Sequence, residues 1–184
     1  MNPIVHHRWF PWAACAGVLI ILFLLFFPPM YVAGDEHQYY KNAILLQNGE
    51  LKSADPLLYC GGVFKGENYL SNYHIGKSFS LVPFTWLPFP FILLSGLIIH
   101  LLNMGIFALI LRKLNIHAWF VALIAFYPAL VWESRTLFSE TFALTFLLGG
   151  LLFYLNKHSH SLFISGLLFG LAAMVRYETI LISL

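Results

Sequence analysis

Five long apolar runs constrain the fold of this 184-residue chain more than any other feature. The first extends from Trp12 to Met30, which as a helix is long enough to cross a bilayer core of ~30 Å. The others are Phe91–Leu111, Ala118–Trp132, Thr141–Leu155 and Leu162 to about Val175, and the tail from Tyr177 to Leu184 is apolar again. The sequence therefore predicts an all-α polytopic membrane protein with about five transmembrane helices.

The composition agrees with a membrane protein and excludes some partners. Hydrophobic residues make up 60% of the chain and charged residues 10%, whereas soluble domains carry roughly 25% charged residues. The net charge of +2 and the absence of a basic cluster argue against nucleic acid as a partner. Cys15 lies in the first run and Cys60 in the loop that follows it, so we expect two free thiols.

The two ends of the chain leave alternatives open. His6, His7 and Arg8 precede the first run and could form the basic head of a signal peptide. The run is longer than a signal-peptide core and no small-residue cleavage site follows it, so we favour an uncleaved first helix. Because the chain ends within an apolar stretch, we expect 1–184 to be one transmembrane domain at the front of a longer protein. The alternative is a last segment that turns back into the membrane.

Charged residues are distributed unequally between the connections. If the N-terminus is cytoplasmic, the inner segments hold Arg8, Arg112, Lys113 and Lys157 and no acidic residue. The outer segments then hold all eight acids, which are Asp35, Glu36, Glu50, Asp55, Glu67, Glu133, Glu140 and Glu178. This pattern follows the positive-inside rule. It predicts a multi-pass protein of the cytoplasmic membrane with an extracytoplasmic first loop over 32–90.

That first loop contains two segments expected to lie at the membrane surface. Glu36–Asn48 is predicted to be an interfacial helix, with the apolar face Tyr39, Tyr40, Ala43, Ile44 and Leu46 opposite the polar face Gln38, Lys41 and Asn42. Ser78–Phe91 is apolar but contains Pro83, Pro88 and Pro90. We therefore expect a broken or interfacial segment there, leading into the second span.

Asp35 and Glu36 are the first charged residues after the first run, and their position permits two interpretations. Asp35 could be a helix N-cap, with Gln38 completing a capping box and Glu36 favouring the helix dipole. Alternatively, a carboxylate held at the membrane surface is partly desolvated, which raises its pKa and makes it a better base. The sequence alone supports both interpretations.

Several cations and polar groups outside the cytoplasm are candidate ligands for an anionic group. His74 and Lys77 flank Gly76, which could form a tight turn beside a ligand; alternatively, Lys77 only extends its amine to the membrane surface. Arg135 is a possible phosphate contact. Arg176 interrupts an apolar stretch and marks either a functional site within the membrane or an ordinary helix end.

Other polar and small residues are expected to serve helix ends and helix packing. Ser139 can cap the fourth span, with Glu140 in its first turn. His100 and Asn103 are expected to pair with each other or with a neighbouring helix. Helix packing is also the expected role of four glycines, namely Gly149, Gly150, Gly166 and Gly170.

Four motifs and their order resemble the N-terminal part of the GT-C-fold membrane glycosyltransferases. They are Gly34-Asp35-Glu36-His37-Gln38-Tyr39-Tyr40; the stretch from Tyr73 to Phe84 with Gly76 and Pro83; Ser139-Glu140; and Gly166 to Ala172 followed by Arg176. The resemblance is to prokaryotic families similar to dolichyl-phosphate-mannose protein mannosyltransferases and lipid A sugar transferases. One departure is His74-Ile75, where that family usually has two prolines before the glycine.

The resemblance implies transfer of a sugar from a polyprenyl-phosphate donor to an extracytoplasmic glycan, lipid or protein acceptor. Asp35 would be the general base of an inverting displacement, and Glu36 would orient the acceptor or tune Asp35. The charged lipid phosphate that leaves would be held by cations, for which the candidates are Lys77, Arg135 and Arg176. The remaining expected substrate contacts are His37, Tyr40, Tyr73, His74 and Glu140. The resemblance implies no certain cofactor, and it leaves a divalent metal open because the family has members of both kinds.

Two other functions remain open at this point. A transporter or flippase of lipid-linked sugars would also use broken helices and outer charges, although transporters place polar residues near the middle of several spans. Here only His100 and Asn103 are so placed. A non-catalytic membrane protein that docks a partner through its loop is the third possibility, and it predicts that Asp35 is replaceable.

Overall fold

The computed structural model describes residues 3–27, 34–53, 63–65, 68–70, 73, 75–88, 90–156 and 158–177. Within these residues the fold is α-helical apart from one short hairpin, β1 (Val63–Lys65) paired antiparallel with β2 (Asn68–Leu70). The longer helices are α1 (Pro3–Leu25), α2 (Gly34–Gln47), α4 (Leu94–Lys113), α7 (Glu140–Tyr154) and α8 (Ser159–Val175). The shorter ones are α3 (Ile75–Leu81), α5 (Val121–Ala125) and α6 (Pro128–Glu133), with single 3₁₀ turns η2 (Val82–Phe84), η3 (Phe91–Leu93) and η4 (Ala118–Phe120).

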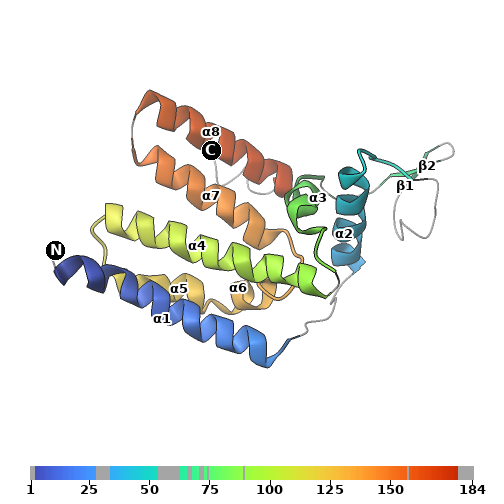
Figure 1. The fold of residues 1–184 in the computed structure, drawn as a ribbon. Helices are drawn as coiled ribbons and strands as arrows, with labels where there is room; N and C mark the ends of the chain where they lie inside the picture. The colour runs from blue at the N-terminus through green and yellow to red at the C-terminus, as the bar shows by residue number, and fades with distance from the viewer. Residues whose placement is uncertain are drawn as a thin grey trace.

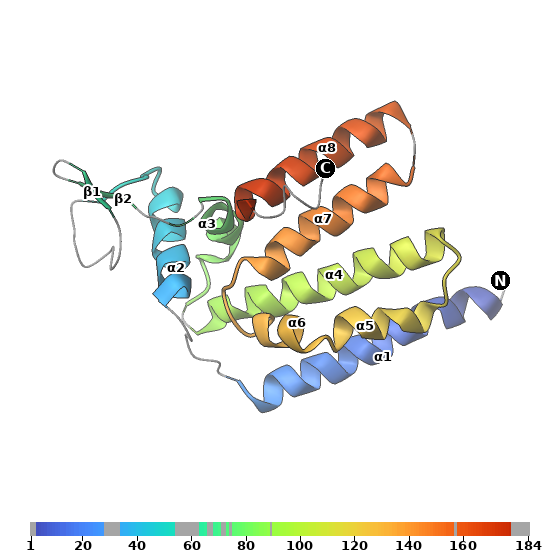
Figure 2. The same ribbon diagram turned by 180° about the vertical axis from the view of Figure 1, so that it is seen from behind.

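The long helices α1, α4, α7 and α8 lie side by side, and α5 and α6 run along α1 and α4 (Figures 1 and 2). Helix α2 crosses one end of this bundle, and α3 lies between α2 and the last turn of α8. We call this the α2 end; it also contains the connection 134–139. The opposite end contains the N-terminus, the turn after α4 and the connection between α7 and α8. Successive connections between the long helices therefore lie at two separate ends of the bundle.

The apolar runs form helices, but the third is not one helix. Among the described residues, the segment 91–113 is the one helix whose length and hydropathy would allow it to cross a membrane, while α7, α8 and the part of α1 from Trp9 are apolar and shorter. The predicted span Ala118–Trp132 is divided into η4, α5 and α6. The division falls at Pro128, which lacks an N–H and holds Tyr127 in an extended conformation (φ −62°, ψ 119°).

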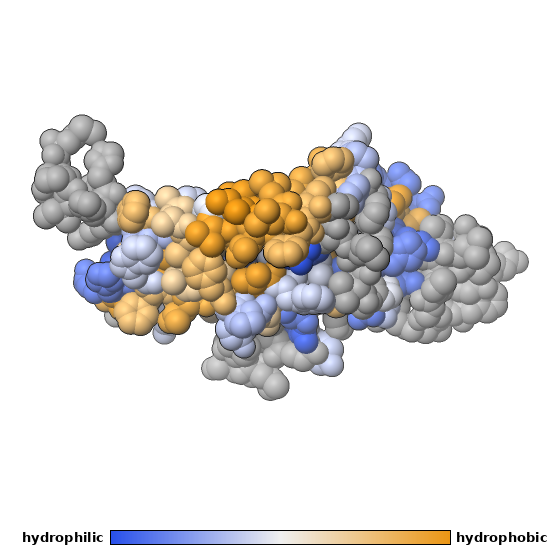
Figure 3. All heavy atoms as spheres, turned by 90° about the horizontal axis from the view of Figure 1, so that it is seen from below, coloured by the Kyte–Doolittle hydropathy of each residue, from blue (hydrophilic) through white to orange (hydrophobic). Residues whose placement is uncertain are grey.

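Hydrophobic side chains lie over the middle of the molecule. Figure 3 shows a hydrophobic band across one face, with hydrophilic residues towards both ends. Several large apolar side chains within the helices are more than half exposed, among them Leu25, Leu123 and Phe163. An apolar band of this kind is unusual on the surface of a monomeric soluble protein.

The two segments of the first loop form much as predicted, with one correction. Ser78–Phe91 is broken into the end of α3, η2, a turn and η3, as its prolines predicted. Helix α2 coincides with the predicted helix, but its predicted faces are wrong, because Gln38 and Asn42 are buried. Both lie in a helix that packs on α3, so its polar side contributes to the interior at the α2 end.

The expected helix caps are also corrected. Helix α2 begins at Gly34, so Asp35 lies in its first turn and is not the N-cap, and its carboxylate accepts a hydrogen bond from a residue outside the helix. Ser139 occupies the N-cap position of α7, but its side chain makes no capping hydrogen bond. Local rules assign both side chains to helix ends, but each interacts with a residue of another segment, Asp35 with Tyr73 and Ser139 with Tyr39.

Two glycines allow close approach of backbones near the α2 end. A Cβ at Gly76 would lie 2.4 Å from the carbonyl oxygen of Met174, so α3 packs directly on the end of α8. A Cβ at Gly96 would lie 2.6 Å from the carbonyl oxygen of Ser134. The role predicted for Gly76, a turn beside a ligand, is therefore wrong, since the glycine is inside α3 and its absent side chain is what lets two helices meet.

The four glycines of the last two helices differ in whether they lie at a helix contact. A Cβ at Gly150 would lie 2.6 Å from the ring of Phe169, and one at Gly149 would lie 3.3 Å from Leu168, so both sit at the contact of α7 with α8 as predicted. Gly166 and Gly170 have no such neighbour within 4 Å, and for them the prediction of a packing contact is wrong.

Candidate functional site

The first turn of α2 places two adjacent carboxylates in different surroundings. Asp35 is half-buried and accepts a hydrogen bond of 2.7 Å from the hydroxyl of Tyr73. Glu36 is fully buried, and its Oε1 accepts a hydrogen bond of 2.8 Å from the backbone N–H of Leu137. Glu36 thus ties α2 to the connection before α7, while Asp35 keeps partial access to its surroundings. Of the two predicted catalytic carboxylates, Asp35 is therefore the more accessible one.

Lys77 is buried completely at the centre of the same end. Its amine lies over the ring of Phe142, 3.0 Å from the centroid, and has no hydrogen-bond partner among the described residues. Burial holds the pKa of Lys77 well below its usual value, while the carboxylates of Glu140, Glu36 and Glu133 oppose that shift. The alternative in which Lys77 extends its amine to the surface is therefore wrong.

Glu133, at the end of α6, is a carboxyl group with altered acidity. Its Oε2 accepts a hydrogen bond of 3.1 Å from the hydroxyl of Thr141. Burial raises the pKa of Glu133 to about 7, helped by repulsion from Glu140 and opposed by the Thr141 hydrogen bond, Arg176 and Lys77. A carboxyl group with a pKa near neutrality can either accept or donate a proton at physiological pH.

Glu140 and Arg176 form an ion pair between the start of α7 and the end of α8. Ser139 lies beside this pair, and Tyr39 of α2 contacts Ser139 through a side-chain hydrogen bond. The pKa of Tyr39 is raised chiefly by burial, and the charges of Asp35, Glu140 and Arg176 also act on it. Tyr39 is therefore within electrostatic reach of both Asp35 on α2 and the ion pair on α7 and α8.

The remaining predicted contacts are less central. His37 and Tyr40 are half-buried on α2, and burial, followed by the charge of Lys41, lowers the pKa of His37. Arg135 donates a hydrogen bond of 2.6 Å to the backbone carbonyl of Phe26, after α1, so it is directed towards that helix. His74 lies outside the described residues.

An apolar cavity of about 580 Å³ lies beside this cluster, between α3, α4, α7 and α8. Its lining includes Gly76 and Phe142, which are the chain neighbour and the ring partner of Lys77. The rest of the lining is mostly apolar, with Phe79, Leu102 and Leu171 among its side chains. Asp35 is not among the residues that line this cavity.

The two polar residues of the second span serve the helix bundle. Nε2 of His100 lies 3.3 Å from the carbonyl oxygen of Ala125, and the amide of Asn103 donates a hydrogen bond of 2.8 Å to the carbonyl oxygen of Thr141. Both side chains are fully buried. Of the two predicted alternatives, pairing with a neighbouring helix is confirmed for both residues.

One member of the cluster, Glu133, was not predicted as a site residue. The sequence signal for Glu133 was its place at the end of an apolar run, but its altered acidity depends on burial beside α7. Within the described residues, no group of three or more histidine, cysteine, aspartate or glutamate side chains is arranged to hold a metal ion. Comparisons with models of known protein families, with curated proteins and with solved structures found no match.

The raised pKa of Glu133 predicts a measurable effect on stability. Because the folded protein holds this proton more tightly than the unfolded chain, Glu133 contributes stability below about pH 4.5 that is lost as the pH rises through about 7. We expect Glu133→Gln to remove this loss, so that the melting temperatures of the wild type and the variant diverge between these two pH values. Thermal melts in detergent measure it. Glu50→Gln removes an exposed carboxylate and should leave the dependence of the melting temperature on pH unchanged. The same pH dependence in the wild type and in Glu133→Gln would contradict the assignment.

Proposed function

We propose that this protein is a membrane glycosyltransferase of GT-C type that moves a sugar from a polyprenyl-phosphate donor to an extracytoplasmic acceptor. The observation that carries the proposal is the meeting of reactive side chains from five segments at one end of the bundle. Asp35 and Tyr39 come from α2, Lys77 from α3, Glu133 from α6, Glu140 from α7 and Arg176 from the end of α8.

The proposed membrane arrangement follows from the same geometry. The apolar band in Figure 3 suits a lipid environment, and the α2 end would face the extracytoplasmic side. Helix α2 would then lie in the plane of the membrane surface, because it crosses the bundle helices (Figure 1). In this arrangement Asp35 is near the boundary between lipid and water, where a lipid-linked sugar and a water-borne acceptor can meet.

In the proposed reaction Asp35 accepts the proton of the acceptor hydroxyl as that oxygen attacks the anomeric carbon. Tyr73 fixes the orientation of the carboxylate through its hydrogen bond. The bond between the anomeric carbon and the phosphate oxygen breaks, the anomeric centre inverts, and polyprenyl phosphate leaves with the bonding electrons. The donor's hydrocarbon chain fits the chemistry of the apolar cavity lined by Phe79 and Leu171.

The cluster contains two cations and four carboxyl groups, so its charge state decides whether it can hold a phosphate. The ion pair between Glu140 and Arg176 is neutral overall, and the raised pKa of Glu133 keeps part of that group uncharged at neutral pH. Lys77 has no hydrogen-bond partner among the described residues, so an arriving phosphate could accept the hydrogen bond that its buried amine lacks and favour the charged amine.

We expect Lys77→Met to raise the KM for the donor by about tenfold or more, because it removes a charge-assisted contact worth about 1.5–3 kcal/mol. Methionine retains most of the apolar stem, so the melting temperature should stay the same or rise. Donor titrations with the full-length protein measure the effect. Lys52→Met, which removes an exposed lysine, is the control, and an unchanged KM in Lys77→Met would remove Lys77 from the proposed phosphate site.

Proteoliposomes containing the full-length protein and a radiolabelled polyprenyl-phosphate sugar test the proposed function. A transferase moves the label to an added acceptor and releases polyprenyl phosphate. A flippase moves the labelled lipid between leaflets with its sugar bond intact, and a docking protein does neither, so either of these results would overturn the proposal.

A further inference from the structure

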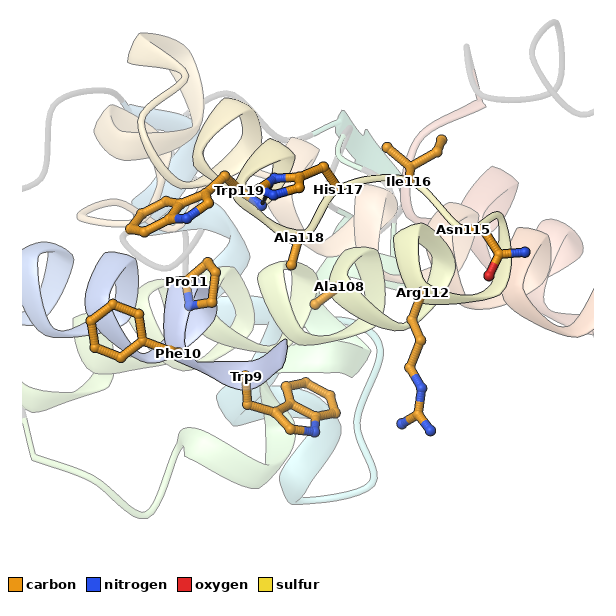
Figure 4. A pocket seen from close by; sticks show the side chains of 10 residues that line it. All are labelled: Trp9, Phe10, Pro11, Ala108, Arg112, Asn115, Ile116, His117, Ala118 and Trp119. Atoms are coloured by element: carbon orange, nitrogen blue, oxygen red, sulfur yellow. Dashed lines mark hydrogen bonds between the residues drawn. The ribbon is translucent and has the colours of Figure 1, made fainter. Parts of the chain in front are cut away.

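A second cavity, of about 490 Å³, lies at the opposite end of the bundle and belongs to none of the features described above. It is enclosed by the start of α1, the last turn of α4 and the connection that leads into η4 (Figure 4). Its lining combines the aromatic rings of Trp9, Phe10 and Trp119 with the guanidinium of Arg112 and the imidazole of His117. Aromatic and cationic side chains in one cavity suit a ligand that has both an apolar and an anionic part.

The chain turn that builds this cavity is encoded locally. After α4 the backbone N–H of Ile116 bonds to the carbonyl of Leu111 at 2.9 Å, and that of Asn115 bonds to the carbonyl of Arg112 at 3.3 Å. Asn115 has a positive φ of 55°, so the three features form a Schellman motif with asparagine in the left-handed position. The turn directs His117 and Trp119 back towards α1, where Trp119 meets Phe10 edge-on with ring centroids 6.2 Å apart.

The electrostatic character of this end is positive. Arg112 is exposed, and among the described residues no side-chain hydrogen bond or ion pair is made by its guanidinium. Nδ1 of His117 faces the backbone N–H of Trp119 at 3.4 Å, which leaves Nε2 to donate a hydrogen bond to a ligand. No acidic residue occurs in 9–12 or 108–119, because all eight acids lie elsewhere in the chain. An anion entering the cavity would therefore meet no carboxylate from the segments that line it.

The apolar part of the cavity continues onto the outer surface of the bundle. Trp9, Phe10 and Trp119 are 40%, 60% and 47% exposed, and Phe120 and Leu123 extend the apolar surface along η4 and α5. In the proposed orientation this end lies at the cytoplasmic face of the membrane, where anionic phospholipids are found. Tryptophan suits this boundary because its ring is apolar and its N–H is polar.

We propose that this cavity binds the head group of an anionic phospholipid, with the phosphate at the guanidinium of Arg112 and the acyl chains along the aromatic rings. The inference rests on the proposed membrane orientation and not on the glycosyltransferase activity. The site would fix the depth and rotation of α1 and α4 in the membrane, far from the chemistry at the α2 end.

Native mass spectrometry of the full-length protein, released from nanodiscs of equimolar phosphatidylglycerol and phosphatidylcholine, tests this site. We expect the wild type to retain phosphatidylglycerol preferentially and Arg112→Gln to reduce that preference by about fivefold, the effect of one basic side chain at an anionic membrane surface. The control is Lys113→Gln, which removes the same charge from the next residue, one that does not line the cavity. Trp119→Leu, which shortens the aromatic wall, should reduce retention of both lipids.

Three results would overturn the inference. They are unchanged lipid preference in Arg112→Gln, an equal reduction in Lys113→Gln, and displacement of the lipid by inorganic phosphate alone. The second would indicate a general surface charge, and the third a site for soluble anions. Because none of these readouts involves sugar transfer, the site and the proposed enzymatic function can fail independently.

Discussion

Replacing Asp35 by asparagine is expected to lower the rate of sugar transfer by about 10²–10⁴-fold, which is the usual contribution of a positioned general base. The side-chain amide of asparagine retains an oxygen that can accept the hydrogen bond from the Tyr73 hydroxyl, so the geometry at the start of α2 should persist. What the variant loses is a group able to take the proton of the acceptor. The proteoliposome assay with labelled donor measures the rate directly.

Two matched variants separate proton transfer from the other roles of these carboxylates. Glu50→Gln removes an exposed carboxylate just beyond α2 and should leave the rate unchanged. Glu36→Gln retains an oxygen that can accept the hydrogen bond from the N–H of Leu137, so it should reduce the rate only a few-fold if Glu36 ties α2 to the bundle. If Asp35→Asn inserted normally and still transferred sugar at near the wild-type rate, Asp35 would not be the base.

Replacing Gly76 by alanine is expected to be the most destabilising single methyl addition in the described chain. The new Cβ would lie 2.4 Å from the carbonyl oxygen of Met174 and 2.7 Å from the backbone nitrogen of Val175, so no flexible side chain can move to admit it. Helix α3 would have to separate from α8, and overpacking of this kind costs about 1–3 kcal/mol or more. Each kcal/mol corresponds to about 2–4 °C in melting temperature for a chain of this size.

Gly170→Ala is the matched control because Gly170 also lies in a helix, and nothing lies within 4 Å of the position of its Cβ. We expect this variant to melt at the same temperature as the wild type or higher, since alanine favours a helix over glycine by about 1 kcal/mol. Differential scanning fluorimetry in detergent compares the two. Equal melting temperatures for Gly76→Ala and Gly170→Ala would contradict the direct contact between α3 and α8. Since Lys77 follows Gly76 on α3, the destabilised variant should also lose donor binding.

The sequence predicted most helices because their signals are local. Apolar runs identified α1, α4, α7 and α8, and the sequence after Gly34 identified α2 to within two residues at its start. The break of the third run at Pro128 was also present in the sequence, since proline cannot continue a helix without losing a hydrogen bond. Length alone favoured one helix there, and the prediction gave the proline too little weight.

Burial of polar groups at the α2 end could not be read from periodicity. Gln38 and Asn42 were assigned to a polar surface, and Lys77 was as readily a surface lysine as a site residue, yet all three are buried. Hydrophobic patterns assume that polar side chains face water, and this assumption fails where several charged elements pack together. The pKa of Glu133 is another example, because it depends on burial and on Glu140 of the next helix.

The sequence by itself determined that acidic and basic residues lie at different connections, because the apolar runs define the helices and the charged residues fall between those runs. It also singled out Asp35, Glu140 and Arg176. Only the tertiary structure decided which of these groups meet, because the deciding contacts join residues far apart in the chain. The hydroxyl of Tyr73 reaches Asp35 across 38 positions, and Leu137 reaches Glu36 across 101. No local rule specifies such pairs, which form when α3 packs against α8 and carries the first loop onto the end of the bundle.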